Sequence, residues 1–162
     1  MSKRKRLQPP RTAIPAIGEG KRGAAGHLGY LLRQAAHAQR KRMDRILAPL
    51  DLTHPQFLVL TMIRAYPGCS NADIARLTML TPQTVHAIIA VLLQRKWVAR
   101  QAHPIHGRVL TLVLSTSGEN LLDRARSAAM TADELLQRSV SAEALAAIRH
   151  WLVSVAHDDA DE

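Results

Sequence analysis

The stretch from Ser70 to Leu114 constrains the fold most, because two helix starts and a two-stranded ribbon follow one another within it. Ser70-Asn-Ala-Asp73 matches a capping box, and Thr81-Pro82 places a capping hydroxyl before a proline at the first helical position. We expect helices over 70–77 and 81–96 and strands over 97–101 and 108–114. This order of elements predicts a winged helix-turn-helix.

The second predicted helix has one apolar face and one unusual outer face. At about 100° per residue, the apolar side chains fall on one side, namely Val85, Ile88, Ile89, Leu92 and Leu93. The opposite side carries no acid and consists of Gln83, His86, Ala87, Ala90 and Gln94. Small side chains allow close approach, and a helix N-terminus attracts phosphate. The major groove of DNA suits both features, although an ordinary amphipathic helix with a solvated face also fits.

The predicted hairpin favours the DNA interpretation. Its second strand alternates Val109, Thr111 and Val113 with leucines, so we expect cover on both faces. The turn over 102–108 contains Pro104 and Gly107 and no acidic residue. A basic hairpin tip beside a helix-turn-helix is typical of a DNA-binding wing.

Over about residues 28–122 the chain resembles the MarR (multiple antibiotic resistance regulator) family of transcription factors. The most specific motifs are Leu80-Thr-Pro-Gln-Thr-Val, Trp97-Val-Ala-Arg100, Pro104-Ile-His-Gly-Arg108 and Leu114-Ser-Thr-Ser-Gly118. In the family the wing usually reads Asp-Pro-x-Asp-x-Arg, and its arginine enters the minor groove. Arg108 takes that position here, but His103 and His106 replace both aspartates, so no carboxylate is expected to orient it.

The resemblance implies a homodimeric, sequence-specific repressor that binds a palindromic operator in double-stranded DNA and is released by a small aromatic or phenolic ligand. We expect base contacts from the start of the second helix, phosphate contacts from the first, and wing contacts to the minor groove and backbone. The predicted DNA-binding residues are Ser70, Asn71, Thr81, Gln83, Thr84, His86, Arg100 and Arg108. Tyr30, Arg33 and His37 could face a ligand cleft, although a solvated helix face explains them as well.

The remaining helices suggest how two copies pair. Helical spacing of apolar residues predicts helices over 27–48, 55–65, 116–138 and from 141 onward, with capping residues at Thr53, Thr116 and Ser141. The first and the last two are too apolar to stand alone, so we expect them to form the dimer. A mainly α fold with a small β-hairpin wing and an all-helical dimerisation region follows. The expected segments are a disordered basic arm (1–25), the first dimerisation helix and linker (26–52), the winged domain (53–115), the C-terminal dimerisation helices (116–156) and an acidic tail (157–162).

Charge is concentrated at the N-terminus. Residues 1–22 contain seven Lys or Arg side chains and one acid, within a formal net charge of +9 over 162 residues. Prolines, glycines and the absence of an apolar period indicate a disordered or loosely docked arm. A ligand-independent, architectural DNA binder that relies on this arm is therefore an alternative. No apolar run reaches the length of a membrane span, and we expect a cytoplasmic protein.

Other chemistry has little support in the sequence. Cys69 is the only cysteine and precedes a helix start, where a thiol pKa can fall, so a thiol-based redox sensor is a second alternative. His103 and His106 lack the carboxylate or thiolate partners of a metal site. Phosphate loops, catalytic triads and paired carboxylates are absent, so we expect no enzyme, no cofactor and no metal. A winged protein-interaction module remains a third alternative.

Overall fold

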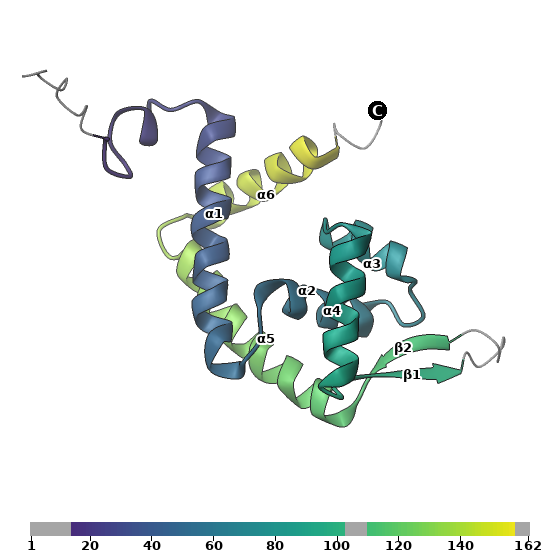
Figure 1. Cartoon of the computed structure of the whole chain (residues 1–162). Coiled ribbons are helices and arrows are strands. Elements are labelled where there is room, and N and C mark those ends of the chain that lie inside the picture. Colours follow the sequence, from purple (N-terminus) through teal and green to yellow (C-terminus); the bar gives the residue numbers. More distant parts are fainter. Residues whose placement is uncertain (1–13, 103–109, 158–162) are drawn as a thin grey trace, which may run out of the picture. The chain divides into compact units, whose positions relative to one another are not determined.

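The computed structural model describes residues 14–102 and 110–157. The chain divides between Gln39 and Arg40 into two units. The first contains the short 3-10 helix η1 (Gly20–Arg22) and the beginning of α1 (Leu28–Leu47). The second contains the end of α1, then η2 (Ala48–Leu50), α2 (His54–Ala65), α3 (Asn71–Thr78), α4 (Pro82–Gln94), β1 (Val98–Ala102), β2 (Leu110–Leu114), α5 (Thr116–Gln137) and α6 (Ala142–His157) (Figure 1).

Helix α2 is the centre of the second unit. It begins with the predicted capping box, in which the Gln56 N–H donates to Thr53 Oγ1 at 3.4 Å and the Thr53 N–H donates to Gln56 Oε1 at 3.0 Å. The helix packs against α3, α4, β2 and α5, and Val59 and Leu60 are completely buried. Burial of each such side chain contributes about 2 kcal/mol to folding. The elements around α2 are therefore held by one shared core.

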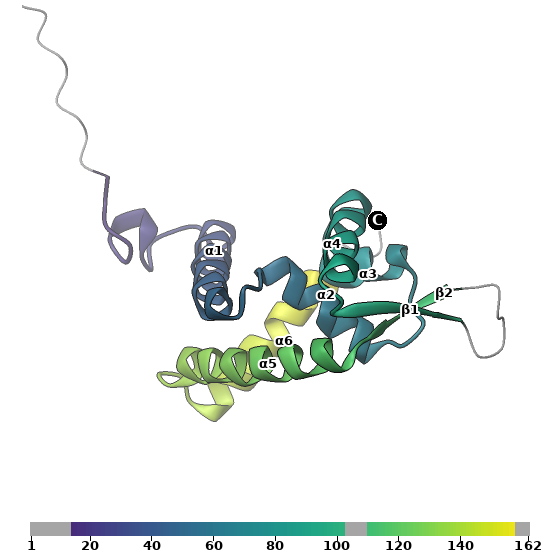
Figure 2. The same ribbon diagram turned by 60° about the horizontal axis from the view of Figure 1, so that its bottom comes forward.

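The same core fixes the positions of the other elements in this unit. Their fully buried side chains are Leu47 of α1, Ile74 of α3, Val85 and Leu92 of α4, and Leu122 of α5. Figures 1 and 2 show α3 and α4 side by side, with the hairpin extending beyond the base of α4. The predicted mainly α, winged helix-turn-helix fold is confirmed.

The hairpin has the predicted strands but is less covered than expected. Val98 lies opposite Leu114 and Ala102 opposite Leu110 in an antiparallel pair. Leu112 is buried, whereas Leu110 is 59% exposed and Val113 is half-buried. Cover on both faces is therefore confirmed only in part, because Leu112 and Val113 on opposite faces are covered, whereas the Leu110 end of the strand projects past α4 and is exposed.

The start of α5 corrects the predicted cap. Ser115, not Thr116, is the N-cap, and its Oγ accepts from the Gly118 N–H at 3.0 Å. Glu119, which completes the predicted box in sequence, instead lies 3.3 Å from Arg64 of α2. The helix thus starts one residue before the predicted box would place it, because tertiary contacts recruit both side chains. The caps at Ser70, Thr81 and Ser141 are confirmed.

The predicted basic arm is only partly described. Its residues 1–13 lie outside the described residues. Its second half is not structureless: the Gly23 N–H donates to Gly20 O at 3.0 Å, and Gln34 Nε2 of α1 donates to Arg22 O at 3.1 Å. This part of the arm therefore forms a turn that is docked on α1.

Candidate nucleic-acid interface

Helices α3 and α4 form a sharply bent pair. The two helices are bent by 111° where they join, within the range typical of a helix-turn-helix. Met79 makes the turn with a left-handed backbone (φ 55°), and the Leu80 N–H donates to Ala75 O at 3.1 Å. The turn aims the N-terminus of α4 away from the core that its other face enters.

The predicted base-contacting side chains of α4 lie together on its exposed face. Gln83, Thr84 and His86 are exposed, as are Ala87 and Ala90. On the other side, Val85, Ile89 and Leu92 are buried in the core. The amphipathic pattern predicted from the sequence is thus confirmed. The exposed face of α4 includes small side chains and contains no acidic residue.

Thr81 and Thr84 are coupled at the start of α4. Thr81 Oγ1 accepts from the Thr84 N–H at 3.2 Å, and the two hydroxyls lie 2.8 Å apart. Each hydroxyl has spare hydrogen-bonding capacity, so a partner outside the protein can still be engaged. The pair also fixes both side chains at the exposed end of the helix.

The start of α3 contains an acid that the sequence analysis did not assign to the interface. The Asp73 carboxylate accepts from the Ser70 hydroxyl at 2.6 Å and from Arg76 Nη2 at 2.6 Å. The hydrogen bond from the Ser70 side chain, then that from Arg76 and that from the Ser70 backbone, lower the pKa of Asp73 to about 2. Arg76 balances this carboxylate, while Ser70 and Asn71 are exposed at the helix start.

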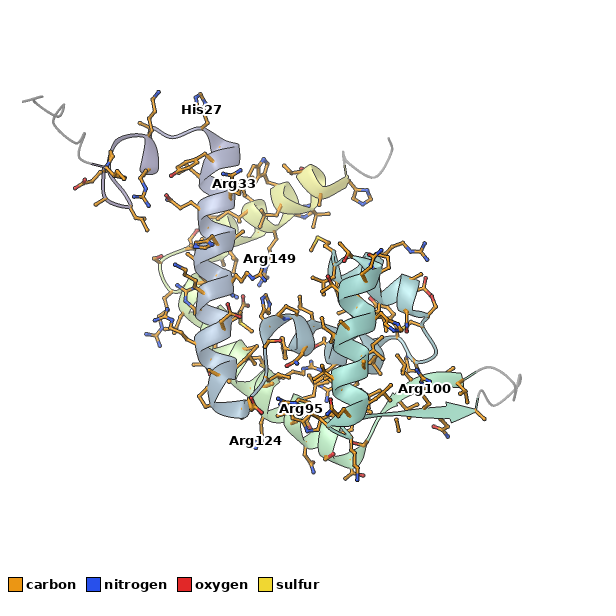
Figure 3. The ribbon with its side chains drawn as sticks, in the orientation of Figure 1. His27, Arg33, Arg95, Arg100, Arg124 and Arg149 are labelled. Carbon is orange, nitrogen blue, oxygen red and sulfur yellow. The ribbon has the colours of Figure 1, made fainter. Side chains whose placement is uncertain are left out.

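The wing is described only at its base. Arg100 is exposed on β1, opposite Leu112 of β2, and Figure 3 shows it along the hairpin. Arg108, His103 and His106 lie outside the described residues, so the predicted minor-groove contact stays a prediction.

A network of contacts ties the base of the wing to the helices on either side. Ser115 Oγ donates to Lys96 O at 2.7 Å, and a Cβ at Gly118 would collide with Trp97 O. Arg95 Nη1 lies 2.6 Å from Asp51 Oδ2, and the guanidinium of Arg95 stands 4.8 Å from the centre of the Trp97 ring. The orientation of the hairpin is therefore coupled to the start of α5.

A cavity among the described residues lies between α2 and α5. We call it the α2–α5 pocket; its volume is about 540 Å³, and it is lined by Phe57, Thr61, Arg64, Ala65, Arg126, Ala129, Met130 and Asp133. Arg64 Nη1 crosses from α2 to α5, 2.6 Å from Asp123 Oδ1 and 3.3 Å from Glu119 Oε2. The pocket thus combines an apolar wall with two guanidinium groups and the Asp133 carboxylate.

The predicted ligand residues of the first unit also share a cavity. Tyr30, Arg33 and His37 line a pocket of about 340 Å³, together with Arg22 and Gln34. Neither Arg22 nor Gln34 was expected from the sequence to line a ligand cavity. Arg22 was assigned to the arm, and Gln34 carried no pattern of its own.

The structure overturns the expected reactivity of Cys69. Its thiol is half-buried, and burial, followed by the nearby Asp73 carboxylate, raises its pKa. A raised pKa reduces the thiolate fraction that reacts with oxidants. The thiol-sensor alternative therefore loses the physical feature on which it rested.

The described residues offer neither a metal-binding cluster nor a single membrane-spanning helix. Within 14–102 and 110–157, no three His, Cys, Asp or Glu side chains are grouped so that they could hold a metal ion. In the same residues no single helix is long and apolar enough to cross a membrane, although two bent pairs of helices reach that length and composition together.

Comparisons with known proteins agree with this geometry. A model of the MarR family matches residues 50–109. The transcriptional repressor Rv2887 of Mycobacterium tuberculosis is 37% identical over 106 residues, covering 65% of this chain and 76% of the relative. Its structure with salicylic acid covers 80% of this chain and 96% of its own, at 32% identity and a TM-score of 0.66. The repressor CouR bound to a 23-mer DNA duplex covers 89% of this chain and 99% of its own, at 26% identity and a TM-score of 0.73. The chain belongs to the MarR family of DNA-binding transcription regulators.

Proposed function

We propose that this protein is a homodimeric repressor that binds a palindromic operator and leaves it when a small aromatic or phenolic acid binds. The observation that carries the proposal is the exposed, acid-free face of α4, which begins at a bent helix junction beside a hairpin. The related CouR was solved on a DNA duplex and Rv2887 with salicylic acid, which supports both halves. The chain acts by binding rather than by catalysis, and it works in the cytoplasm.

Each predicted DNA-binding residue has a proposed role. Gln83, Thr84 and His86 reach base edges in the major groove, where amides, hydroxyls and imidazoles can distinguish base pairs. Ser70, Asn71 and Thr81 contact phosphates from the helix starts. Arg108 enters the minor groove, and Arg100 lies near the backbone.

The dimer is supported by the surface of the last two helices. Helix α6 buries none of its side chains in the described chain. The exposed large apolar residues of α5 and α6 are Met130, Leu135, Leu136, Ile148, Leu152, Val153 and Val155. A second copy covers such a surface most simply by two-fold symmetry, with the two α4 helices about 34 Å apart, one turn of DNA.

We place the ligand that releases DNA in the α2–α5 pocket. An aromatic ring fits against Phe57 and Met130, and a carboxylate is attracted by Arg64 and Arg126. A ligand carboxylate at Arg64 competes with Glu119 and Asp123, which now hold that guanidinium. Since Glu119 belongs to the first turn of α5, whose N-cap contacts the base of the wing, this competition changes the hairpin's support.

A matched pair of variants tests the release mechanism. Labelled operator duplex, selected from a random library, is bound to the full chain and titrated with salicylate. We expect release from the wild type, at least ten-fold weaker release from Arg126→Gln, and wild-type release from Arg124→Gln, which removes the same charge outside the pocket. If salicylate released DNA equally from both variants, the ligand would not bind in this pocket. If the wild type selected no DNA sequence, the proposal that the protein is a sequence-specific repressor would itself be contradicted.

A further inference from the structure

The end of α4 turns into the wing at Arg95, the C-cap of that helix. Lys96 makes the turn with a left-handed backbone (φ 57°), and the Trp97 N–H donates to Leu92 O at 3.0 Å. The Arg95 side chain lies against this turn, with its guanidinium 4.8 Å from the centre of the Trp97 ring. One guanidinium group therefore joins the end of α4 to the start of the wing.

The same guanidinium also holds the linker that follows η2. Arg95 Nη1 donates to Asp51 O at 2.9 Å and to Asp51 Oδ2 at 2.6 Å. Asp51 has a left-handed backbone (φ 51°), and its N–H donates to Ala48 O at 3.0 Å. Aspartate is among the residues that tolerate this conformation best. The linker thus offers a carbonyl and a carboxylate oxygen to Arg95 from a defined turn.

Trp97 connects these contacts to the start of α5. Its carbonyl oxygen accepts from the Ser115 N–H at 3.0 Å and from Ser115 Oγ at 3.2 Å. Gly118 allows α5 to approach this carbonyl so closely that an added Cβ would collide with it. We call Asp51, Arg95, Trp97, Ser115 and Gly118 the junction cluster. It lies where α4, the wing and α5 meet.

This position gives the junction cluster leverage over the distance between the two α4 helices of a dimer. Helix α5 carries exposed apolar side chains, Leu135 among them, which we propose face the second copy. It has 22 residues and is about 33 Å long. A tilt of about 10° at its start moves its far end by about 6 Å, close to two base-pair steps of about 3.4 Å each. Two half-sites can be read together only if this angle is fixed.

The contacts of Arg95 supply orientation more than stability. The side chains of Arg95 and Asp51 are 36% and 84% exposed, and exposed ion pairs stabilise a fold little. Two hydrogen bonds and the face of the Trp97 ring nevertheless fix the guanidinium in one place. Loss of these contacts should therefore loosen the junction without unfolding the chain.

We infer that Arg95 is a positioning residue that sets the spacing of the half-sites read by the dimer. By joining the Asp51 linker to the Trp97 ring, it holds α4 and the base of the wing at one angle to α5. The inference rests on the proposed homodimeric repressor and deepens it, because it assigns operator spacing to a contact within each protomer.

Operator duplexes of altered spacing test this role. The full chain first selects its operator from a random library. Fluorescence anisotropy then measures binding to that operator, to versions with one or two base pairs inserted between the half-sites, and to a single half-site. We expect each insertion to weaken binding of the wild type ten-fold or more. In Arg95→Gln the same insertions should weaken binding three-fold or less, and affinity for the single half-site should stay within two-fold of the wild type.

Two further variants separate position from charge. Lys96→Gln removes the same charge from an exposed side chain outside the junction cluster, so the ten-fold spacing penalty should persist. Asp51→Asn changes the charge in the opposite direction and keeps a residue that tolerates the left-handed backbone. Because a neutral acceptor holds a guanidinium less strongly, its spacing penalty should be at least two-fold smaller than that of the wild type. Circular dichroism should show the same helical content in all variants.

Several results would overturn the inference. One is an unchanged spacing penalty in Arg95→Gln or Asp51→Asn, and another is a relaxed spacing in Lys96→Gln or in the wild type. A third is an equal loss of affinity by Arg95→Gln on the operator and on the single half-site, which would indicate a direct DNA contact. If the wild type selected no palindrome at all, the repressor proposal would fail instead, so the two failures are distinguishable.

Discussion

The outer faces of α4 and α6 are both exposed in one copy of the chain, yet their chemistry differs. On α4 the exposed residues include Gln83, His86 and Ala87. On α6 the apolar residues Leu152 and Val153 are 44% and 59% exposed. Exposure by itself therefore says little about the partner. Small and hydrogen-bonding side chains at a helix start suit DNA, whereas branched apolar side chains suit another protein surface.

The largest effect is expected from placing an acid on the α4 face. Ala87→Asp adds a negative charge and bulk where we propose that the helix meets DNA, so affinity for operator should fall about 100-fold or more. The dimer should remain intact in analytical ultracentrifugation, because Ala87 lies on α4, whereas the proposed dimer surface consists of apolar side chains of α5 and α6. Loss of the dimer in Ala87→Asp would contradict the proposed division between a DNA-binding face on α4 and a dimer face on α6.

A similar loss by a different route is expected on α6. Leu152→Asp places a charge on the apolar face and should shift the protein to monomers, with DNA affinity reduced about 100-fold through lost bivalency. His150→Asp, an exposed change on the opposite side of the same helix, is the control and should stay dimeric. Sedimentation and anisotropy measure the two properties separately. If Leu152→Asp remained dimeric, α6 would not be part of the dimer interface.

A smaller and more selective effect is expected from Gln83→Ala. If the amide reads a base edge, its loss should cost about 1–3 kcal/mol on the preferred sequence and relax the preference at one base pair in each half-site. Selection from a random duplex library measures this directly. An equal loss of affinity on every sequence would show that Gln83 contacts phosphate instead.

Arg108→Ala sharpens the division between specificity and positioning. A minor-groove arginine adds affinity with little sequence information, so binding should weaken evenly on all sites. The slope of log affinity against log salt should fall by about 1. Affinity measured at several salt concentrations gives the slope. An unchanged slope would exclude a charge contact of Arg108 with DNA.

The smallest effect concerns Asp73 at the start of α3. Its pKa of about 2 lies below the ordinary value of 3.8, because the Ser70 hydroxyl and Arg76 donate to the carboxylate. A depressed pKa means that folding favours the charged form of the carboxyl group. The contribution of Asp73 to the stability of the folded state is therefore present above pH 3.8 and is lost as the pH falls toward 2. An NMR titration of the Asp73 carboxyl carbon should show a midpoint near 2. A midpoint near 4 would contradict the capping box in solution.

Local signals in the sequence predicted much of the fold. Thr53, Ser70 and Thr81 are caps as expected, because each hydroxyl is followed closely by a helix whose apolar face enters the core. At Ser115 and Thr116 two adjacent hydroxyls compete, and only the tertiary contacts of Ser115 with Lys96 O and of Glu119 with Arg64 decide between them.

The features that the sequence did not predict share a physical cause, because they depend on contacts between residues that are distant in the sequence. Burial raises the pKa of Cys69, and no local motif reports burial. Arg22 looked like part of a charged tail, because hydrophobic periodicity does not detect a loop built on glycines. The cavity it shares with Gln34 exists only once that loop docks on α1.

The most direct test of the central claim is a binding titration of the full chain against a random-sequence duplex library at two salt concentrations, with sequencing of the bound fraction. The account predicts a palindromic consensus whose half-sites lie one helical turn apart, with affinity that falls as salt rises. Binding without a consensus, lost steeply with salt, would indicate an architectural DNA binder. Absence of binding even at low salt would indicate a protein-interaction module and contradict the DNA-binding role of α4.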